Sequence, residues 1–167
     1  MKKFTIFTLA VFFGLSFVQA QGDFKAGISG GLPLGDAGDL ATFSIAVDLG
    51  YLFDLSDNVQ AGPIAGFSHS FGDKLDTGIG TIEIDDVQFL PIGGGVRFNL
   101  SEQFGLGADL GYALGINDGN DGGFYYSPRV QYSVSEIIDL VLAYRGISED
   151  GGSWDILSFG VEFNLSK

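Results

Sequence analysis

The sequence predicts an all-β protein: an eight-stranded, antiparallel up-and-down transmembrane β-barrel that follows a cleaved signal peptide. The first observation is a two-residue alternation of apolar side chains, clearest between Phe43 and Phe53, which indicates strands with one apolar face. The segment from Phe43 to Phe53 spans 11 residues, about what a tilted strand needs to cross a bilayer. The second observation is an N-terminal leader, and the third is an alternation of short turns with longer loops.

The first twenty residues have the features of a secretory signal peptide. Lys2 and Lys3 give a positive start, residues 4–18 are apolar, and Ala20 ends a small-x-small cleavage site. A retained membrane helix is disfavoured because the apolar run is short. We therefore expect a signal peptide over residues 1–20 and one outer-membrane β-barrel domain over residues 21–167.

The composition excludes several classes of function. Cysteine is absent, so the chain has no disulfide and no thiolate metal site. The formal net charge is -13, and loss of the leader would remove two lysines. Such an acidic chain is a poor candidate for binding nucleic acid by charge. No cofactor is expected.

Turn signals divide the remaining chain into eight predicted strands. We place them at residues 23–34, 41–54, 58–71, 86–100, 103–116, 122–134, 137–147 and 154–166. Three connections are very short, at residues 55–57, 100–102 and 134–136, and four are longer, at residues 35–40, 72–85, 117–123 and 148–153. In bacterial outer-membrane barrels the short turns are periplasmic, and an even strand number places both termini at that end.

The first four predicted strands keep the alternation to different degrees. The first alternates weakly, through Phe24 and Ile28, whereas the second alternates over its whole length. The third contains Pro63, which removes a hydrogen-bond donor from the ladder. In the fourth, Val87 and Phe89 are out of phase with the apolar residues that follow, so we expect a bulge or loop extension there.

The last four predicted strands alternate more regularly. The fifth sets Leu, Phe and Tyr on one face against mainly Gly and Ala on the other, and the next three continue this arrangement. At the start of the eighth, Trp154 and Ile156 are out of phase with Leu157, which predicts a second bulge or loop extension. The octapeptide that begins at Gly95 recurs in similar form at Gly160, which indicates two related four-stranded halves.

The two faces of the predicted strands differ in a way that favours a membrane barrel. The polar face is rich in Gly, Ala and Ser and carries few charges, which suits the narrow lumen of an eight-stranded barrel. The apolar face carries aromatic residues near the strand ends, like the interfacial girdles of membrane barrels. The alternative is a soluble periplasmic lipocalin-like carrier, which would bury the apolar face instead.

Eight charged residues fall on the face that we assign to the lumen. They are Lys25, Asp48, Arg97, Asp109, Arg129, Asp139, Arg145 and Glu162. Four positive and four negative groups in a narrow interior are expected to pair, because an unpaired buried charge is costly. A polar conduit or proton path is the functional alternative, but small barrels are filled by their own side chains, so we favour a salt-bridged plug.

His69 is the one residue that suggests catalysis. It lies between Ser68 and Ser70, and small barrels that remodel lipid A use a Ser, a His and a carboxylate at the outer leaflet. Neighbouring residues of a strand point to opposite faces, however, so His69 cannot easily orient either serine. No acid in the flanking sequence shares its face, and we expect no enzyme activity.

The longer loops are strongly acidic. Their carboxylates are Asp36, Asp39, Asp73, Asp76, Glu83, Asp85, Asp86, Asp118, Asp121, Glu149, Asp150 and Asp155, against the single cation Lys74. The segment 117–122 resembles a calcium loop, but it lacks the EF-hand spacing and the closing Glu. Asp118 and Asp121 are therefore only a possible divalent-cation loop, which could bridge to anionic lipopolysaccharide. The alternative is a solvated acidic surface.

Two segments carry a resemblance to a known family. Residues 90–98 (LPIGGGVRF) and 160–165 (GVEFNL) are similar to those of the small OmpA/OmpX-like outer-membrane β-barrel family, especially its Bacteroidetes-type members. The resemblance implies the outer membrane of a Gram-negative bacterium, with outer-membrane lipid, lipopolysaccharide and the barrel-assembly machinery as partners. The chain ends in Ser166-Lys167, whereas the proteobacterial form ends in an aromatic residue.

Four functions follow as hypotheses. The first is a structural or adhesion-type barrel that binds an unknown extracellular ligand through its acidic loops. The second is a narrow porin-like channel, although a wide aqueous lumen needs more strands. The third is the soluble carrier, and the fourth is a lipid A-modifying enzyme that uses His69.

Overall fold

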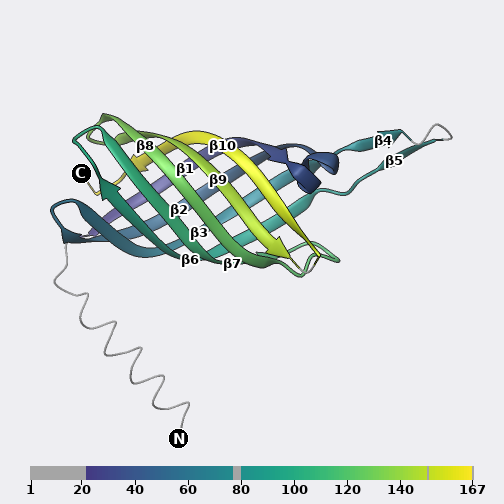
Figure 1. Ribbon diagram of the computed structural model, residues 1–167, viewed down its shortest axis with the longest axis horizontal. Helices are drawn as coiled ribbons and strands as arrows, with labels where there is room; N and C mark the ends of the chain where they lie inside the picture. The colour runs from purple at the N-terminus through teal and green to yellow at the C-terminus, as the bar shows by residue number, and fades with distance from the viewer. Residues whose placement is uncertain (1–21, 77–79, 150, 167) are drawn as a thin grey trace, which may run out of the picture.

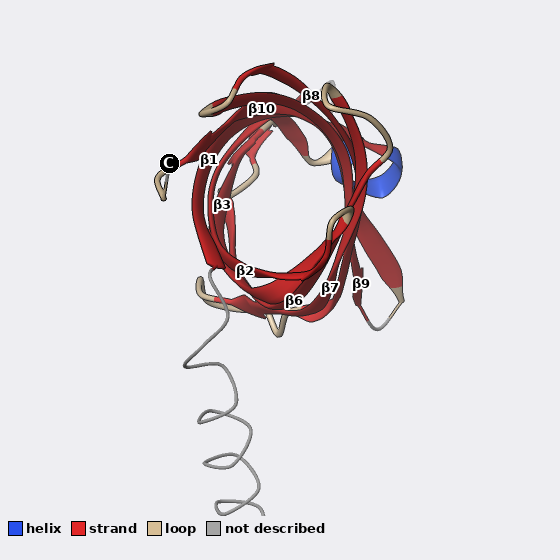
Figure 2. Ribbon diagram, turned by 90° about the vertical axis from the view of Figure 1, so that its left-hand side faces the viewer, coloured by secondary structure: helices blue, strands red, loops and turns tan. Residues whose placement is uncertain are grey.

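The computed structural model describes residues 22–76, 80–149 and 151–166, which form a closed antiparallel barrel and a small projecting hairpin (Figures 1 and 2). Around the barrel the strand order is β1-β10-β9-β8-β7-β6-β3-β2, and the ring closes between β1 and β2. The predicted fold class is confirmed. The predicted signal peptide, residues 1–20, lies outside the described residues, as does Asp150.

The barrel strands match the predicted segments to within two residues at each end. They are β1 (Gly22–Leu34), β2 (Ala41–Ser56), β3 (Val59–Gly72), β6 (Val87–Asn99), β7 (Phe104–Gly115), β8 (Gly123–Ser135), β9 (Ile138–Glu149) and β10 (Gly152–Asn164). Every neighbouring pair is antiparallel. Chain neighbours are also sheet neighbours, which is the up-and-down arrangement.

Two further elements lie in the longer connections. A 3-10 helix, η2 (Gly35–Asp39), follows β1, and the connection between β3 and β6 contains a hairpin of β4 (Lys74–Asp76) and β5 (Thr81–Glu83). We had predicted this connection as a loop without strands. The hairpin projects well beyond the end of the barrel wall (Figure 1). No helix in the described ranges is long and apolar enough to cross a membrane.

The apolar face of the strands lies outside. Ile28, Leu32 and Phe159 are 60%, 58% and 57% exposed, and most large apolar side chains of the strands share this outward position. Charged residues such as Arg97 and Glu162 are buried inside. This arrangement is the reverse of a soluble lipocalin, which would place its polar residues outside. A continuous apolar exterior needs lipid as its solvent.

The prediction of a bulge or loop extension at Val87 and Phe89 and at Trp154 and Ile156 is wrong, because these residues lie within β6 and β10. The register between β6 and β7 is unbroken from Phe89 onward, and the register between β9 and β10 is unbroken through Trp154. The out-of-phase apolar residues keep the regular alternation and point inward, where Phe89, Trp154 and Ile156 are buried. Register shifts occur elsewhere, between β2 and β3 and between β8 and β9. The apolar residues change phase at these two places because the interior of the barrel is apolar at this end, so they face inward without a bulge.

Candidate functional site

The interior of the barrel has three layers, and an apolar layer closes the end that carries the longer loops. Its buried members are Ala37, Ala41, Phe89, Ala113, Tyr125, Ile147, Trp154 and Ile156. The rings of Phe89 and Trp154 lie 6.3 Å apart between centroids. The Trp154 indole Nε1 donates a hydrogen bond of 3.2 Å to Ser70 Oγ, so its polar atom is satisfied inside the layer. We call these eight residues the apolar plug.

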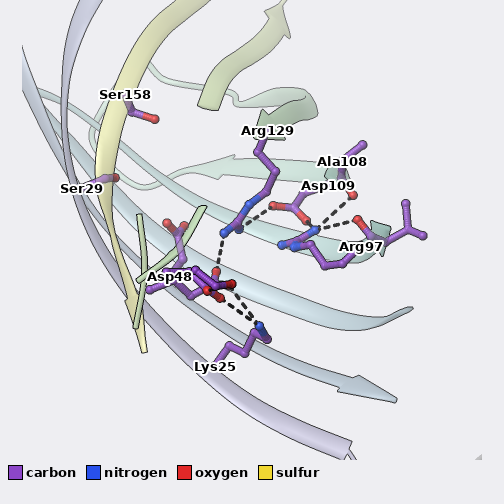
Figure 3. A network of polar contacts seen from close by, with 12 residues as sticks. Lys25, Ser29, Asp48, Arg97, Ala108, Asp109, Arg129 and Ser158 are labelled. Carbon is purple, nitrogen blue, oxygen red and sulfur yellow. Dashed lines mark hydrogen bonds and ion pairs between the residues drawn. The ribbon is translucent and has the colours of Figure 1, made fainter. Parts of the chain in front are cut away.

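The middle layer is a chain of ion pairs. Asp109 lies between two arginines (Figure 3), with 2.6 Å from its Oδ1 to Arg97 Nη1 and 3.9 Å from its Oδ2 to Arg129 Nη1. Arg129 Nη2 donates to Glu162 Oε2 at 2.6 Å. Lys25 Nζ continues the chain, at 3.7 Å from Glu162 Oε1 and 3.5 Å from Asp139 Oδ2. Opposite charges therefore alternate across the lumen.

A second ion pair lies beside this chain. Arg145 Nη1 donates to Asp48 Oδ1 at 3.0 Å, and Arg145 Nη2 also donates to the same carboxylate. The remaining donors of the guanidinium reach Ser158 Oγ at 3.1 Å and Ser29 Oγ at 3.3 Å. The structure thus brings together all eight predicted lumen charges, from every barrel strand except β3.

Little free space remains around these charges. Three small cavities border the ion pairs, with volumes of about 10, 20 and 10 Å³. A cavity needs roughly 10–15 Å³ to hold one water molecule. These cavities are therefore large enough for isolated water molecules only.

The third layer is an open, polar cavity at the end with the short turns, and we call it the vestibule. Its volume is about 700 Å³, and its wall includes Asp23, Gln60 and Gln131. The Gln60 amide donates to Asp23 Oδ2 at 2.9 Å and to Asp54 Oδ1 at 2.8 Å. The lumen is therefore open at one end and closed at the other.

His69 lies on the outer surface near the end with the longer loops. Its Nε2 is 3.2 Å from Asp86 Oδ2, and its Nδ1 is 3.0 Å from the Gln88 amide nitrogen. No acid of the flanking sequence shares the face of His69, and Asp86 comes from a segment distant in sequence, because the register places β6 beside β3. Ser68 and Ser70 are buried on the opposite, inner face. Both ring nitrogens have partners, and neither partner is a serine hydroxyl.

The possible divalent-cation loop, residues 117–122, is fixed to β6 by the side-chain amides of two asparagines. The Asn117 side chain accepts the Gln88 N–H at 2.9 Å, and the Asn120 side chain donates to the Gln88 carbonyl at 3.0 Å. Asp118 and Asp121 are exposed. In the part of the chain that the structure describes, no three His, Cys, Asp or Glu side chains are grouped to hold a metal ion.

Asp121 instead lies near Glu149, across a surface cavity of about 400 Å³. Partial burial raises the pKa of the Glu149 carboxyl, and the negative charge of Asp121 raises that pKa further. The loop after β7 and the end of β9 thus meet through two carboxylates of like charge. A positively charged partner would relieve this repulsion.

The apolar plug is the feature that sequence reasoning missed. Its signal was present, because Phe89, Trp154 and Ile156 broke the phase of an otherwise regular alternation. Tyr125 also fell on the face assigned to the lumen. We attributed the phase break to bulges or loop extensions. Large inward-facing apolar residues at the same end of several strands were the alternative explanation.

A comparison with protein-family models gives one match. The model described as "Outer membrane protein beta-barrel domain" matches residues 5–165. No curated protein matches the chain.

Several solved structures are similar in fold. The backbone structure of the Yersinia pestis outer membrane protein Ail in a phospholipid bilayer nanodisc has a TM-score of 0.60 at 15% identity, covering 87% of this chain and 100% of that chain. A de novo designed transmembrane β-barrel has a TM-score of 0.56 at 15% identity, covering 88% and 98%. The N-terminal β-barrel domain of Pseudomonas aeruginosa OprF has a TM-score of 0.54 at 14% identity, covering 88% and 100%. At these identities the likeness concerns the fold alone.

Proposed function

The chain belongs to the outer-membrane protein β-barrel family and is a protein of the Gram-negative outer membrane, and on this premise we propose that it acts as a structural and partner-binding barrel through its acidic extracellular loops. The β4–β5 hairpin carries this proposal, because it extends the chain beyond the barrel end (Figure 1). The other loops at that end are shorter. A projecting hairpin gives a partner access without contact with the membrane.

The charges of the loops indicate the chemistry of the partner. Exposed carboxylates include Asp36, Asp39, Asp85 and Asp118. The loop cation Lys74 is paired with Glu83 at 2.6 Å between Nζ and Oε1. A cationic surface, or divalent cations that bridge to lipopolysaccharide, fits these loops.

A likeness in fold to Ail does not transfer its ligand. A crystal structure of Ail, at 14% identity and a TM-score of 0.56, is a complex with the heparin analogue sucrose octasulfate. That ligand is a polyanion, and the acidic loops of this chain would repel it. The proposed partner of this chain therefore differs from that ligand in the sign of its charge.

Transport through the lumen is not part of the proposal. The apolar plug, the ion pairs and the small cavities between them all oppose a water-filled path. Catalysis is not part of it either, since His69 faces outward between Asp86 and Gln88 and general-base chemistry needs a positioned nucleophile. A His69→Ala strain should keep its lipid A profile, and a changed profile would revive the enzyme hypothesis.

The sequence at the end of β10 suggests a further partner. Its end, with Phe163 exposed and Asn164 buried, is similar to the C-terminal signal that barrel-assembly machinery recognises. We include that machinery among the proposed partners during biogenesis.

A complementation experiment tests the loop function. A deletion strain receives either the wild-type gene or a variant in which residues 73–86 are replaced by an Asn-Gly turn. We expect both genes to restore resistance of the envelope to detergent, and only the wild type to restore adhesion of cells to a cationic protein surface. Equal adhesion with both genes would refute the role of the hairpin.

A further inference from the structure

The surface cavity between Asp121 and Glu149 lies on the outside of the barrel, where the loop after β7 meets the ends of β8 and β9. We call it the loop cavity. Its volume of about 400 Å³ is within the range of about 300–1,000 Å³ that is usual for small-molecule sites. The β4–β5 hairpin, which carries the proposed function, does not line it.

Two aromatic side chains line the loop cavity. Tyr112 of β7 and Phe124 of β8 hold directly opposite positions in the ladder and are 48% and 53% exposed. The Phe124 ring stacks on that of Tyr126, with 6.4 Å between centroids. Tyr112 Oη donates a hydrogen bond of 3.2 Å to the carbonyl oxygen of Asp121. Each ring is therefore held by a neighbour at the border of the cavity.

Two carboxylates, those of Asp121 and Glu149, lie in the same lining. They are close enough for the charge of Asp121 to act on Glu149. Within residues 22–76, 80–149 and 151–166, no third ligand joins them to form a metal site. Carboxylates beside exposed aromatic rings suit an organic cation, because the ring faces attract a positive charge and the carboxylates pair with it.

The surface around the loop cavity matches an amphiphile. Toward the middle of the barrel, the next opposite pair of β7 and β8 is Leu110 and Tyr126, and Leu110 is 54% exposed on the apolar exterior. Along β7 the outer surface thus changes from apolar Leu110 to aromatic Tyr112 and then to the acidic loop. Aromatic belts mark the level where hydrocarbon meets lipid headgroups. A lipid in this position would place its acyl chains beside Leu110 and its headgroup in the cavity.

The opposite end of the same two strands provides a contrast. Phe104 of β7 and Tyr132 of β8 are also directly opposite, and their rings contact each other edge to face, with 5.0 Å between centroids. An interfacial aromatic girdle accounts for that pair. It does not account for an aromatic pair that borders a cavity together with two carboxylates.

We propose that the loop cavity binds the ammonium headgroup of an outer-leaflet lipid. Asp121 and Glu149 pair with the ammonium group, and the hydroxyl of Ser148, which also lines the cavity, accepts one of its hydrogen bonds. Tyr112 and Phe124 cover the headgroup from the side of the barrel. The proposal rests on the proposed function in taking the longer loops as extracellular, but it needs no part of the hairpin.

Quenching of tryptophan fluorescence by brominated lipids tests the proposal. The site reporter is Leu110→Trp in a Trp154→Phe background. The matched reporter is Leu106→Trp in the same background, which lies on the same strand nearer the opposite end and is 43% exposed. A shift in gel mobility on heating verifies that each variant is folded.

The two probes differ in one essential group. The protein is placed in phosphatidylglycerol vesicles that contain either phosphatidylethanolamine or galactosyl diacylglycerol, each brominated on its acyl chains. Both probes have no net charge, and only phosphatidylethanolamine carries an ammonium group. Its phosphate is repelled by the carboxylates, so a preference for this probe must come from the ammonium group.

We expect phosphatidylethanolamine to bind beside the site reporter about fivefold more strongly than the galactolipid, and the two probes to bind within about twofold of each other at the matched reporter. This comparison leaves the site itself unchanged. With the site reporter, Asp121→Asn with Glu149→Gln should reduce the preference to less than about twofold.

An aromatic variant, Tyr112→Leu with Phe124→Leu, should reduce the preference to a similar extent. Its matched control is Phe104→Leu with Tyr132→Leu, which removes the aromatic pair at the other end of the same strands. The control for charge is Asp57→Asn with Glu102→Gln, in the short turns. Both controls should keep the preference.

Four results would overturn the proposal. Equal preference at the two reporters would show a property of the whole lipid boundary. A preference that survives the aromatic variant would show attraction to charge alone, and an equal loss in either control would show an effect without a site. Loss of the preference in millimolar Mg²⁺ would assign the carboxylates to a divalent cation.

The hairpin replacement separates this proposal from the proposed function. A protein without residues 73–86 should keep the preference for phosphatidylethanolamine, and its loss would assign the selectivity to the hairpin. Failure of the hairpin to support adhesion would refute the proposed function and leave the lipid result standing.

Discussion

At the scale of residues, the charged side chains of the lumen form ion pairs because they are buried away from water. Arg129 and Glu162 have side chains that are 6% and 7% exposed, so each charge depends on its partner for solvation. The alternation of the strands predicted which charges point inward. It could not predict which of them pair, because pairing depends on strand register and on the stagger between strands.

Arg129→Met should destabilise the barrel by about 3 kcal/mol, because Glu162 and Asp109 each lose a buried partner. The double variant Arg129→Met with Glu162→Gln should recover part of that loss. Equilibrium unfolding in urea in lipid vesicles measures both values. An Arg129→Met protein as stable as the wild type would show that the ion pair is not required.

Trp154, the only tryptophan of the chain, should report the apolar plug directly. Because its indole lies inside the barrel, lipids brominated on their acyl chains should quench its fluorescence weakly. A matched reporter is Phe43→Trp in a Trp154→Phe background, since Phe43 faces outward and is 42% exposed. That reporter should be strongly quenched. Strong quenching of Trp154 itself would place it in lipid and contradict the plug.

At the scale of elements, close contact between β6 and β7 depends on two facing glycines. Gly93 pairs with Gly111, and a Cβ added to Gly93 would lie 2.0 Å from the carbonyl oxygen of Leu110. A Cβ on Gly111 would lie 2.1 Å from the carbonyl oxygen of Ile92. These obstacles are backbone atoms, so the strands would have to separate to make room.

Gly93→Ala should therefore cost more than about 3 kcal/mol of stability or prevent closure of the barrel. Its neighbour provides the control, because a Cβ on Gly94 meets its nearest atom at 3.9 Å, an ordinary contact. Gly94→Ala should change stability by no more than about 0.5 kcal/mol. Urea unfolding of the two variants gives the comparison, and equal stability of both would refute the close approach.

The elements also show how far the sequence could predict this fold. The alternation gave the eight strands almost to their ends, since one face must meet lipid and the other the lumen. The β4–β5 hairpin escaped prediction because both its strands are only three residues long. The prediction of a bulge or loop extension at Phe89 and Trp154 was wrong. Periodicity indicates which face of the strand a residue occupies, but it does not indicate the polarity of the surroundings. The contact of His69 with Asp86 depends on pairing between strands that are distant in sequence.

At the scale of the whole molecule, the two ends of the barrel differ in structure and in charge. The end with the longer loops is closed by apolar side chains and carries the projecting hairpin. The end with the short turns is open and acidic. The middle is neutral, because four positive and four negative side chains pair within it. Binding at either end therefore needs no passage of solute between them.

Closure of the sheet also predicts the behaviour of the intact molecule in detergent. Because the strands pair around a complete ring, the barrel leaves no free edge from which to unravel. The unboiled protein from the outer-membrane fraction should migrate on a detergent gel differently from the boiled protein. Identical mobility before and after boiling would contradict a closed barrel.

The most direct test of the account is the conductance of the purified protein in a planar lipid bilayer, with a water-filled porin as positive control. The apolar plug and the paired charges predict no stable conductance steps in the wild type. Reproducible ohmic steps that scale with salt concentration would show an open lumen. That result would contradict the plug and restore the porin as the function of this barrel.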